Sequence, residues 1–318
     1  MRSLNTKFWL KTVLVCLVIN ANAAFASSNL ERCSTLLNTQ SYDAAFEACK
    51  NAAEQGHADA QFELGNIYYF GIWLTQDYTE AVRWYRAAAE RGLAEAQYNL
   101  GVMYSNGYGV IRDYSMAERW YRAAAEQGDL RSKILLGLML SYGTKIEQNL
   151  EEALQLFRTA ANYGMADAQY YLGWLLSDEL ISDDQNVNHI NFLEALHWLR
   201  RSADQGNTSA MLDIARLYFL GKGVMQDYSE TVYWYLQAAV NGSARGQSYL
   251  GRMYENGMGV EISLVKAHAW YNISASLGNE SGTIARNSVA SKMTNEQITQ
   301  AQALARQCLN SNLTDCGY

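Results

Sequence analysis

The residues best placed for acyl-transfer chemistry in this sequence are Ser263 and Lys266. In their Ser-x-x-Lys spacing a lysine can assist a serine nucleophile. The chain has neither the Ser-Asp-Asn nor the Lys-Thr-Gly motif that accompanies such a pair in enzymes. Ser263 also occupies a position at which other segments place an aspartate at the start of a helix. We therefore expect Ser263 to cap a helix, and we expect the chain not to be an enzyme.

The histidines do not indicate a metal site. They are His57, His189, His197 and His268. No two of them, alone or with a cysteine, have the spacing of metal ligands. The loops at Gly107 and Gly221 lack the third glycine and the strand that a nucleotide-binding fingerprint requires. The sequence predicts no metal and no cofactor.

Two sets of recurring residues indicate the elements that position every candidate side chain. The first set is Gly65, Gly101, Gly137, Gly173, Ala215 and Gly251, and the second is Trp84, Trp120, Leu156, Trp198, Trp234 and Trp270. Both sets advance by 36 residues per step, apart from one shared interval of 42. A fixed period of this size indicates an array of units that bury their apolar faces by stacking on their neighbours.

Each 36-residue repeat has the pattern of a helical hairpin. The first helix is indicated by apolar residues at helical spacing, as in Ala96, Leu100 and Met103, and the second by the run around Trp120. A capping box is expected to start the second helix, with its polar residue at Asp77, Asn149, Asn191 or Asp227 and a glutamate three residues later. Left-handed glycines are expected to end it, at Gly92, Gly128, Gly164, Gly206, Gly242 and Gly278.

These residues resemble the Sel-one-like repeat family, a 36-residue relative of the tetratricopeptide repeat. The best copy matches it at Ala96, Leu100-Gly101, Tyr104, Gly107, Gly109-Val110, Asp113, Ala117, Trp120-Tyr121, Ala124-Ala125 and Gly128. The resemblance covers roughly residues 41–278. It implies an all-α, right-handed superhelical solenoid of antiparallel helix pairs that holds proteins together, and it does not by itself imply catalysis.

The first 26 residues have the pattern of a secretory signal peptide. Basic residues precede the apolar run 12–19, and small residues then lead to an expected cleavage before Ser27. The alternative, a membrane anchor, needs about 20 apolar residues, which this run does not reach. We therefore expect export to the periplasm or beyond, without stable membrane insertion.

The charge balance argues against nucleic-acid or anionic membrane partners. The chain has 25 Lys and Arg against 32 Asp and Glu, a net charge of −7. Removal of residues 1–26 takes away three basic residues and no acid, which gives −10. Such a chain is repelled by phosphate-rich surfaces.

Four cysteines remain after the expected cleavage, in one pair near each end. They are Cys33, Cys49, Cys308 and Cys316. In an exported protein, close pairs of this kind indicate disulfides. Each bridge would stabilise a terminal part of the array, which packs against a neighbouring repeat on one side only. The alternative is four buried free thiols.

The repeats divide the chain into four parts. Residues 1–26 form the signal peptide, 27–57 an N-terminal cap, 58–278 six full repeats, and 279–318 a helical cap whose last helix starts with the capping box at Thr294 and Gln297. The longer interval places a polar insertion within 178–191, expected in the loop between two helices. Neutral drift and contact with a partner both remain open as explanations for this insertion.

The remaining functional candidates lie on the surface of the first helices, which usually line the concave side of such arrays. The expected binding residues are Asn66, Tyr69, Asn99, Tyr171, Trp174, Asp213, Arg216, Phe219, Tyr249 and Arg252. Aromatic residues and arginine anchor interfaces, and they are concentrated in repeats four to six. Inter-unit packing is the competing interpretation for each aromatic residue.

These observations favour an exported scaffold or adaptor that binds a protein or peptide. The runner-up is a penicillin-binding or β-lactam-hydrolysing protein, because a cysteine-rich branch of the family has been described in this way. That branch carries a cysteine pair in most units, and the internal units here have none. A third interpretation is a polysaccharide-binding accessory protein or an adaptor of the endoplasmic reticulum.

Overall fold

The computed structural model describes residues 31–33, 35–36, 42–143, 146–177, 185–313 and 316. Within these residues all regular secondary structure is helical, which confirms the all-α prediction. The expected signal peptide and the first half of the expected insertion lie outside the described residues. The chain divides into two compact units, Met1–Asn149 and Leu150–Tyr318. We describe each unit by itself.

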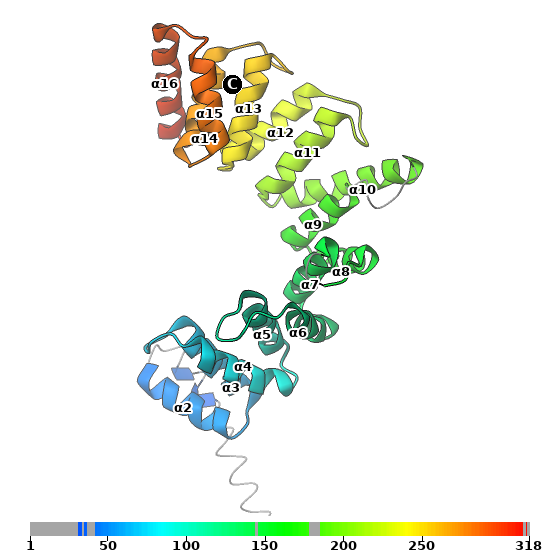
Figure 1. Ribbon diagram of the computed structural model, residues 1–318, viewed down its shortest axis with the longest axis vertical. Coiled ribbons are helices and arrows are strands. Elements are labelled where there is room, and N and C mark those ends of the chain that lie inside the picture. The colour runs from blue at the N-terminus through cyan, green and yellow to red at the C-terminus, as the bar shows by residue number, and fades with distance from the viewer. Residues whose placement is uncertain are drawn as a thin grey trace, which may run out of the picture. The chain divides into compact units, whose positions relative to one another are not determined.

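Unit 1 holds the helices coloured blue to green in Figure 1. They are α2 (Tyr42–Glu54), α3 (Ala58–Phe70), α4 (Tyr78–Glu90), α5 (Ala94–Asn106), α6 (Tyr114–Glu126) and α7 (Leu130–Tyr142). Each helix packs against the next one along the chain. Its core consists of small and large apolar side chains from these helices, such as Leu64, Leu100 and Tyr85.

Unit 2 continues the same alternation with the helices coloured green to red (Figure 1). They are α8 (Leu150–Asn162), α9 (Ala166–Leu176), α10 (Gln185–Ala203), α11 (Thr208–Leu220), α12 (Tyr228–Val240), α13 (Ala244–Asn256), α14 (Leu264–Ser276), α15 (Glu280–Ala290) and α16 (Asn295–Asn310). The last two helices both pack on α14. Thr294 and Gln297 form the expected capping box at the start of α16.

Asp77 and Asp227 cap second helices, as predicted, although Glu80 is used differently from the prediction. Asp77 accepts hydrogen bonds from the backbone N–H groups of Thr79 and Glu80 at the start of α4. The Glu80 carboxylate pairs with Arg83 at 3.0 Å. After α4, Gly92 has a φ of 91°, the left-handed conformation that lets the chain leave the helix.

The expectation for the insertion was wrong in one respect. Asn191 does not start a helix, because α10 already begins at Gln185. Part of the segment expected to be a loop is therefore an N-terminal extension of α10. No glycine or proline lies between Gln185 and Asn191, so no residue of low helix propensity of this kind prevents α10 from starting before Asn191.

The recurring glycine is required by the packing of the two helices in a pair. A Cβ atom on Gly101 would lie 2.6 Å from the ring of Tyr121, and one on Gly65 would lie 2.6 Å from Tyr85. The tryptophan of the second helix is also mostly buried, with an exposed fraction of 9% at Trp120 and 1% at Trp270. Burial of these rings between hairpins holds successive repeats together within each unit.

A recurring buried glutamine, which the sequence analysis missed, connects four of the six first helices to the helix before them. Gln97 Nε2 donates to the Ala89 carbonyl at the end of α4 (3.2 Å), and Gln97 Oε1 accepts from Gln127 (2.7 Å). Gln61, Gln169 and Gln247 each donate in the same way to the residue eight positions earlier. The same carbonyl also accepts from the backbone N–H three residues later, as Ala89 does from Gly92 (3.0 Å), so the amide gives it a second donor.

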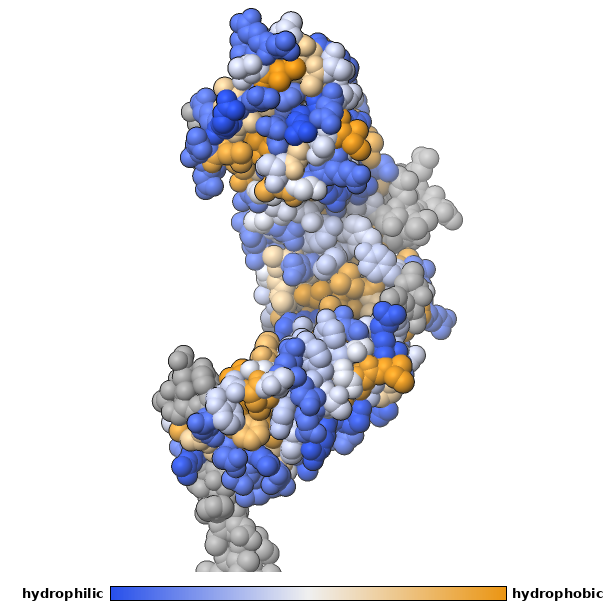
Figure 2. All heavy atoms as spheres, turned by 60° about the vertical axis from the view of Figure 1, so that its left-hand side comes forward, coloured by the Kyte–Doolittle hydropathy of each residue, from blue (hydrophilic) through white to orange (hydrophobic). Residues whose placement is uncertain are grey.

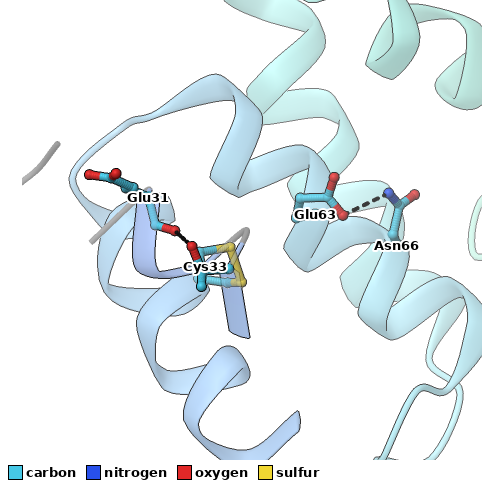
Figure 3. Close-up of a disulfide and its surroundings, with 6 residues drawn as sticks. Glu31, Cys33, Glu63 and Asn66 are labelled. Atoms are coloured by element: carbon cyan, nitrogen blue, oxygen red, sulfur yellow. Dashed lines mark hydrogen bonds between the residues drawn. A yellow bond between two sulfur atoms is a disulfide. The ribbon is translucent and has the colours of Figure 1, made fainter. Parts of the chain in front are cut away.

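The cysteines pair as predicted. Cys33 joins Cys49 of α2 with a Cα–Cα distance of 4.7 Å, and Figure 3 shows this disulfide beside α2. Cys308 of α16 joins Cys316 with a Cα–Cα distance of 4.6 Å. Both distances lie in the range that a disulfide spans. All four residues are buried.

Candidate binding surface

The first helix of each repeat carries three face positions. Relative to the recurring glycine, which is Ala215 in the fifth repeat, they lie six residues before it, two residues before it and one residue after it. We call those of α3, α5 and α7 the unit 1 face: Asp59, Glu63, Asn66, Glu95, Asn99, Val102, Arg131, Leu135 and Leu138. Those of α9, α11 and α13 form the unit 2 face: Asp167, Tyr171, Trp174, Ser209, Asp213, Arg216, Arg245, Tyr249 and Arg252. All eighteen side chains are exposed or half-buried, so they can meet a partner.

The unit 1 face contains a cavity of about 380 Å³. It is lined by Phe62, Asn66, Tyr69, Phe70, Tyr85, Glu95, Tyr98, Asn99, Val102, Met103 and Arg131. Three residues predicted separately, Asn66, Tyr69 and Asn99, are thus brought together at one site. The sequence analysis singled out Tyr69 but not the other aromatic residues of the lining, and it did not single out Arg131. Their register position, which repeats from unit to unit, is the signal that could have found them.

Hydrogen bonds connect the polar groups of this cavity. Tyr85 Oη donates to Asn66 Oδ1 (2.7 Å), and Asn66 Nδ2 donates to the Glu63 carboxylate (3.3 Å). Figure 3 shows Glu63 and Asn66 side by side on α3. Burial raises the pKa of Tyr85 well above its usual range, and a hydrogen bond with Asn99 opposes that rise. Tyr85 therefore stays protonated and keeps donating to Asn66.

Arg131 forms part of the wall of the same cavity. Its guanidinium lies 4.3 Å from the centre of the Tyr98 ring, which is a cation–π contact. It also pairs with Asp129 at 2.9 Å. The positive charge of Arg131 is therefore balanced by a neighbour close to it in the chain.

A second, smaller cavity of about 230 Å³ follows along the unit 1 face. It is lined by Ser105, Tyr114, Tyr121, Leu135, Leu138, Met139 and Tyr142. Leucines occupy two face positions of α7 where α5 has Asn99 and Val102, and this makes the second cavity more apolar. On the face of the molecule in Figure 2, apolar patches of this kind are bordered by hydrophilic residues.

The unit 2 face is organised around an acid and several arginines. Arg216 Nε donates to Asp213 (3.3 Å), and Arg216 Nη2 donates to the buried Ser177 (3.4 Å). Burial raises the pKa of the Asp213 carboxyl, and the nearby charge of Arg216 opposes that rise. The pair fixes the Arg216 guanidinium between α9 and α11.

Aromatic rings support the arginines of α13. Tyr249 lies 5.0 Å from Tyr235, centre to centre, and the Arg245 guanidinium lies 5.9 Å from the Tyr249 ring. Burial, with the neighbouring Tyr249, raises the pKa of Tyr235 to about 12. Arg252 follows one turn after Tyr249 and is exposed. Arg245 was missed by the sequence analysis, although it lies at the same face position as Arg131.

Two predicted aromatic residues also contribute to packing. The Tyr171 ring stacks on Phe157 at 5.7 Å, and the Phe219 ring lies 5.4 Å from Tyr228. Both rings stay half-buried, so each combines inter-helix packing with an accessible edge. Trp174 is half-buried as well, and it lies at the register position that Arg216 and Arg252 occupy in the next two repeats.

Ser263, which has the spacing to Lys266 of a catalytic serine, caps a helix, as predicted. Ser263 Oγ accepts a hydrogen bond from the Lys266 backbone N–H (3.2 Å) at the start of α14. The Lys266 ammonium instead lies 5.2 Å from the Tyr254 ring. In the described part of the chain, no three His, Cys, Asp or Glu residues come together as metal ligands would. No helix among the described residues is long and apolar enough to cross a bilayer.

The Sel1 repeat profile matches residues 58–93, 94–129, 131–164, 166–207, 208–243 and 244–279. The chain belongs to the Sel1 repeat family. Repeats of this family commonly form protein-interaction scaffolds, which are generally not enzymes. No curated protein matches the sequence.

Two solved structures are similar to this Sel1 repeat protein. A Sel1 repeat protein from Oxalobacter formigenes is 29% identical with a TM-score of 0.65, covering 77% of this chain and 96% of the other. A protective antigen present in uropathogenic Escherichia coli strains, displaying an SLR fold, is 26% identical with a TM-score of 0.57. That match covers 92% of this chain and 70% of the antigen.

Proposed function

We propose that this Sel1 repeat protein is an exported adaptor that binds a protein or peptide on the side lined by its first helices. The observation that carries the proposal is the unit 2 face, where Trp174, Arg216 and Arg252 share one register position. Residues of these types are enriched among the side chains that dominate binding energy. At the same position unit 1 has Asn66, Val102 and Leu138.

The packing of the helices supports this choice of side. Within unit 2, α11 contacts α9, and α13 contacts α15, in addition to the helices adjacent to them in the chain. First helices of successive pairs therefore approach one another. This is expected on the inner side of a curved stack, which is the extended surface that such proteins use for binding.

Export is proposed from the two ends of the chain. The basic, apolar and small-residue pattern of residues 1–26 is typical of a cleaved signal peptide. The paired cysteines at 33 and 49 and at 308 and 316 suit an oxidising compartment, such as the periplasm or the extracellular space. We propose that residues 27–57 and 279–318 act as the terminal caps of the repeats.

The test begins with affinity capture of a partner by the purified protein and measurement of its affinity. Trp174→Ala and Arg216→Ala are then each expected to weaken binding about thirtyfold, which corresponds to a loss of about 2 kcal/mol. The unfolding midpoint of each variant should stay close to that of the parent. Tyr163→Ala and Arg306→Ala, which are exposed and lie off the first helices, are the matched controls.

Wild-type affinity in both Trp174→Ala and Arg216→Ala would contradict the proposal for this face. The segment 178–191 would then be the next surface to test. Hydrolysis of a chromogenic β-lactam by the purified protein would contradict the adaptor proposal and favour the enzyme interpretation. We expect no hydrolysis, because the Ser263 hydroxyl is engaged by the backbone of α14.

A further inference from the structure

We propose that the 380 Å³ cavity of the unit 1 face binds a basic side chain, arginine or lysine, from an extended segment of a partner protein. This inference rests on the proposed adaptor function and adds the chemistry of the partner. It concerns unit 1, whereas the argument for the adaptor came from unit 2. The two proposals can therefore fail separately.

Aromatic rings form much of the cavity wall. The side chains of Phe62, Tyr69, Tyr85 and Tyr98 line it, from helices α3, α4 and α5. The rings of Phe62 and Tyr85 lie 5.8 Å apart, and those of Tyr69 and Tyr85 lie 6.4 Å apart. The face of an aromatic ring attracts a cation, and several rings around one space recognise ammonium and guanidinium groups.

The charge of the helices around the cavity has the complementary sign. Helix α3 carries Asp59 and Glu63, helix α5 carries Glu95, and neither helix contains a lysine or an arginine. The charge of Arg131 on the opposite wall is balanced by Asp129. Helix α4 carries two acids and two arginines, and the Lys133 ammonium of α7 donates to the Ala125 carbonyl. The acid of the lining, Glu95, would therefore attract a basic ligand and speed its association.

The polar groups of the cavity are arranged to accept hydrogen bonds. The Tyr85 hydroxyl donates its hydrogen bond to Asn66, and the Asn66 amide donates one of its hydrogen bonds to Glu63. When ionised, a carboxylate can only accept hydrogen bonds, and Glu95 places one in the lining, with Glu63 behind Asn66. An arginine supplies five N–H donors and a lysine three, so either side chain matches this lining.

The chain already places one guanidinium against this lining. Arg131 covers the Tyr98 ring at 4.3 Å, while its side chain remains 50% exposed. This contact shows that the cavity wall accommodates a planar cation at van der Waals range. The proposed ligand would make the same kind of contact with the half-buried ring of Tyr69.

The experiment uses the purified protein and a fluorescent nine-residue peptide of glycine and serine with a central arginine. Its matched probe carries citrulline, which keeps the shape and loses the charge. We expect the citrulline peptide to bind at least tenfold more weakly by fluorescence anisotropy. Glu95→Gln should weaken binding of the arginine peptide about fivefold, whereas Glu126→Gln, the same charge change on α6, should leave it unchanged. A Tyr69→Leu variant should also weaken binding, and it tests the contact with an aromatic ring without a change in charge.

Equal binding of the two peptides, or equal affinities of the Glu95→Gln and Glu126→Gln variants, would overturn the inference. So would unchanged affinity in Tyr69→Leu, provided that its unfolding midpoint matches the parent. If these results occur while Trp174→Ala still loses its partner, the adaptor proposal stands without the cavity. If the arginine peptide binds as expected while Trp174→Ala and Arg216→Ala keep their partner, the unit 2 proposal fails and the cavity remains.

Discussion

The unit 1 face and the unit 2 face are built on the same register but present different chemistry. The position after the recurring glycine holds Asn66, Val102 and Leu138 in unit 1, and Trp174, Arg216 and Arg252 in unit 2. The first helices α3 and α5 carry acids without bases, whereas α13 carries two arginines. The backbone of a hairpin therefore does not decide what it recognises.

The residues that hold the hairpins together are, in contrast, shared by both units. The bridge from Gln97 to Gln127 in unit 1 has its counterpart in Gln169 and Gln205 in unit 2. The close contact of glycine with tyrosine recurs at Gly251 and Tyr271. Framework positions are buried and face positions are accessible, so the face can vary at little cost in stability. The predictions below test this division, from the largest expected effect to the smallest.

The largest effect is expected for the tryptophans that fill the seam between hairpins. Trp120→Ala should lower the free energy of unfolding by about 3–5 kcal/mol, because its ring is buried in unit 1. Trp234→Ala, at the same position of unit 2, should cost less because Trp234 is only half-buried. Denaturant unfolding measures both. A loss below about 1 kcal/mol for Trp120→Ala would place this residue outside the framework.

One disulfide cross-links the terminal segment of each unit. Cys33 and Cys49 are 16 residues apart, for which the loop-closure model gives about 3 kcal/mol. Cys308 and Cys316 are only 8 residues apart, so their contribution should be smaller, about 2.5 kcal/mol. Mass spectrometry of the unreduced protein after alkylation checks both bridges. Four alkylated cysteines would show that neither bridge forms.

The buried glutamines should behave alike in the two units. Gln97→Met removes one of the two donors to the Ala89 carbonyl and the acceptor of the Gln127 amide, at a cost of about 1 kcal/mol. Gln169→Met should cost a similar amount in unit 2. The fifth repeat naturally has Met211 at this position, so the shape is tolerated. Unchanged unfolding midpoints in both variants would remove these glutamines from the shared framework.

His268 makes the stability of unit 2 depend on pH. His268 occupies the position that Val82 fills in unit 1, and its pKa is lowered by burial and then by the charge of Arg286. The unfolded chain therefore binds a proton at higher pH than the folded chain does. Stability should fall as the pH drops below the ordinary histidine value of 6.5 and towards the lowered folded value. His268→Val should lose this component of the pH dependence in thermal melts at about pH 7.5 and pH 5.5, on either side of the ordinary value.

The smallest effect is expected where the two faces differ most. Arg252→Asn gives unit 2 the amide that Asn66 provides in unit 1, and it should change stability by less than about 0.5 kcal/mol because Arg252 is exposed. Partner binding should nevertheless weaken. A destabilisation as large as that of Gln97→Met would show that face positions also belong to the framework.

The sequence by itself determined the helical pairs and their register. The 36-residue spacing of Gly65 and Gly101, the caps at Asp77 and Thr294 and the paired cysteines all depend on near neighbours in the chain or on a fixed period. Hydrogen bonds at a helix end involve residues three or four apart, so a local pattern suffices to predict them.

Only the tertiary structure decided the site. The cavity of unit 1 joins side chains of α3, α4, α5 and α7, and its shape follows from the distances between helices that no local pattern encodes. The start of α10 at Gln185 likewise overrode the polar composition that had indicated a loop. The glutamine bridge depended on which carbonyl lies beside Gln97, eight residues away and at the end of the preceding helix. Contacts between separate helices are set by packing, and for this reason a residue such as Arg131 acquired its role only once its neighbours were in place.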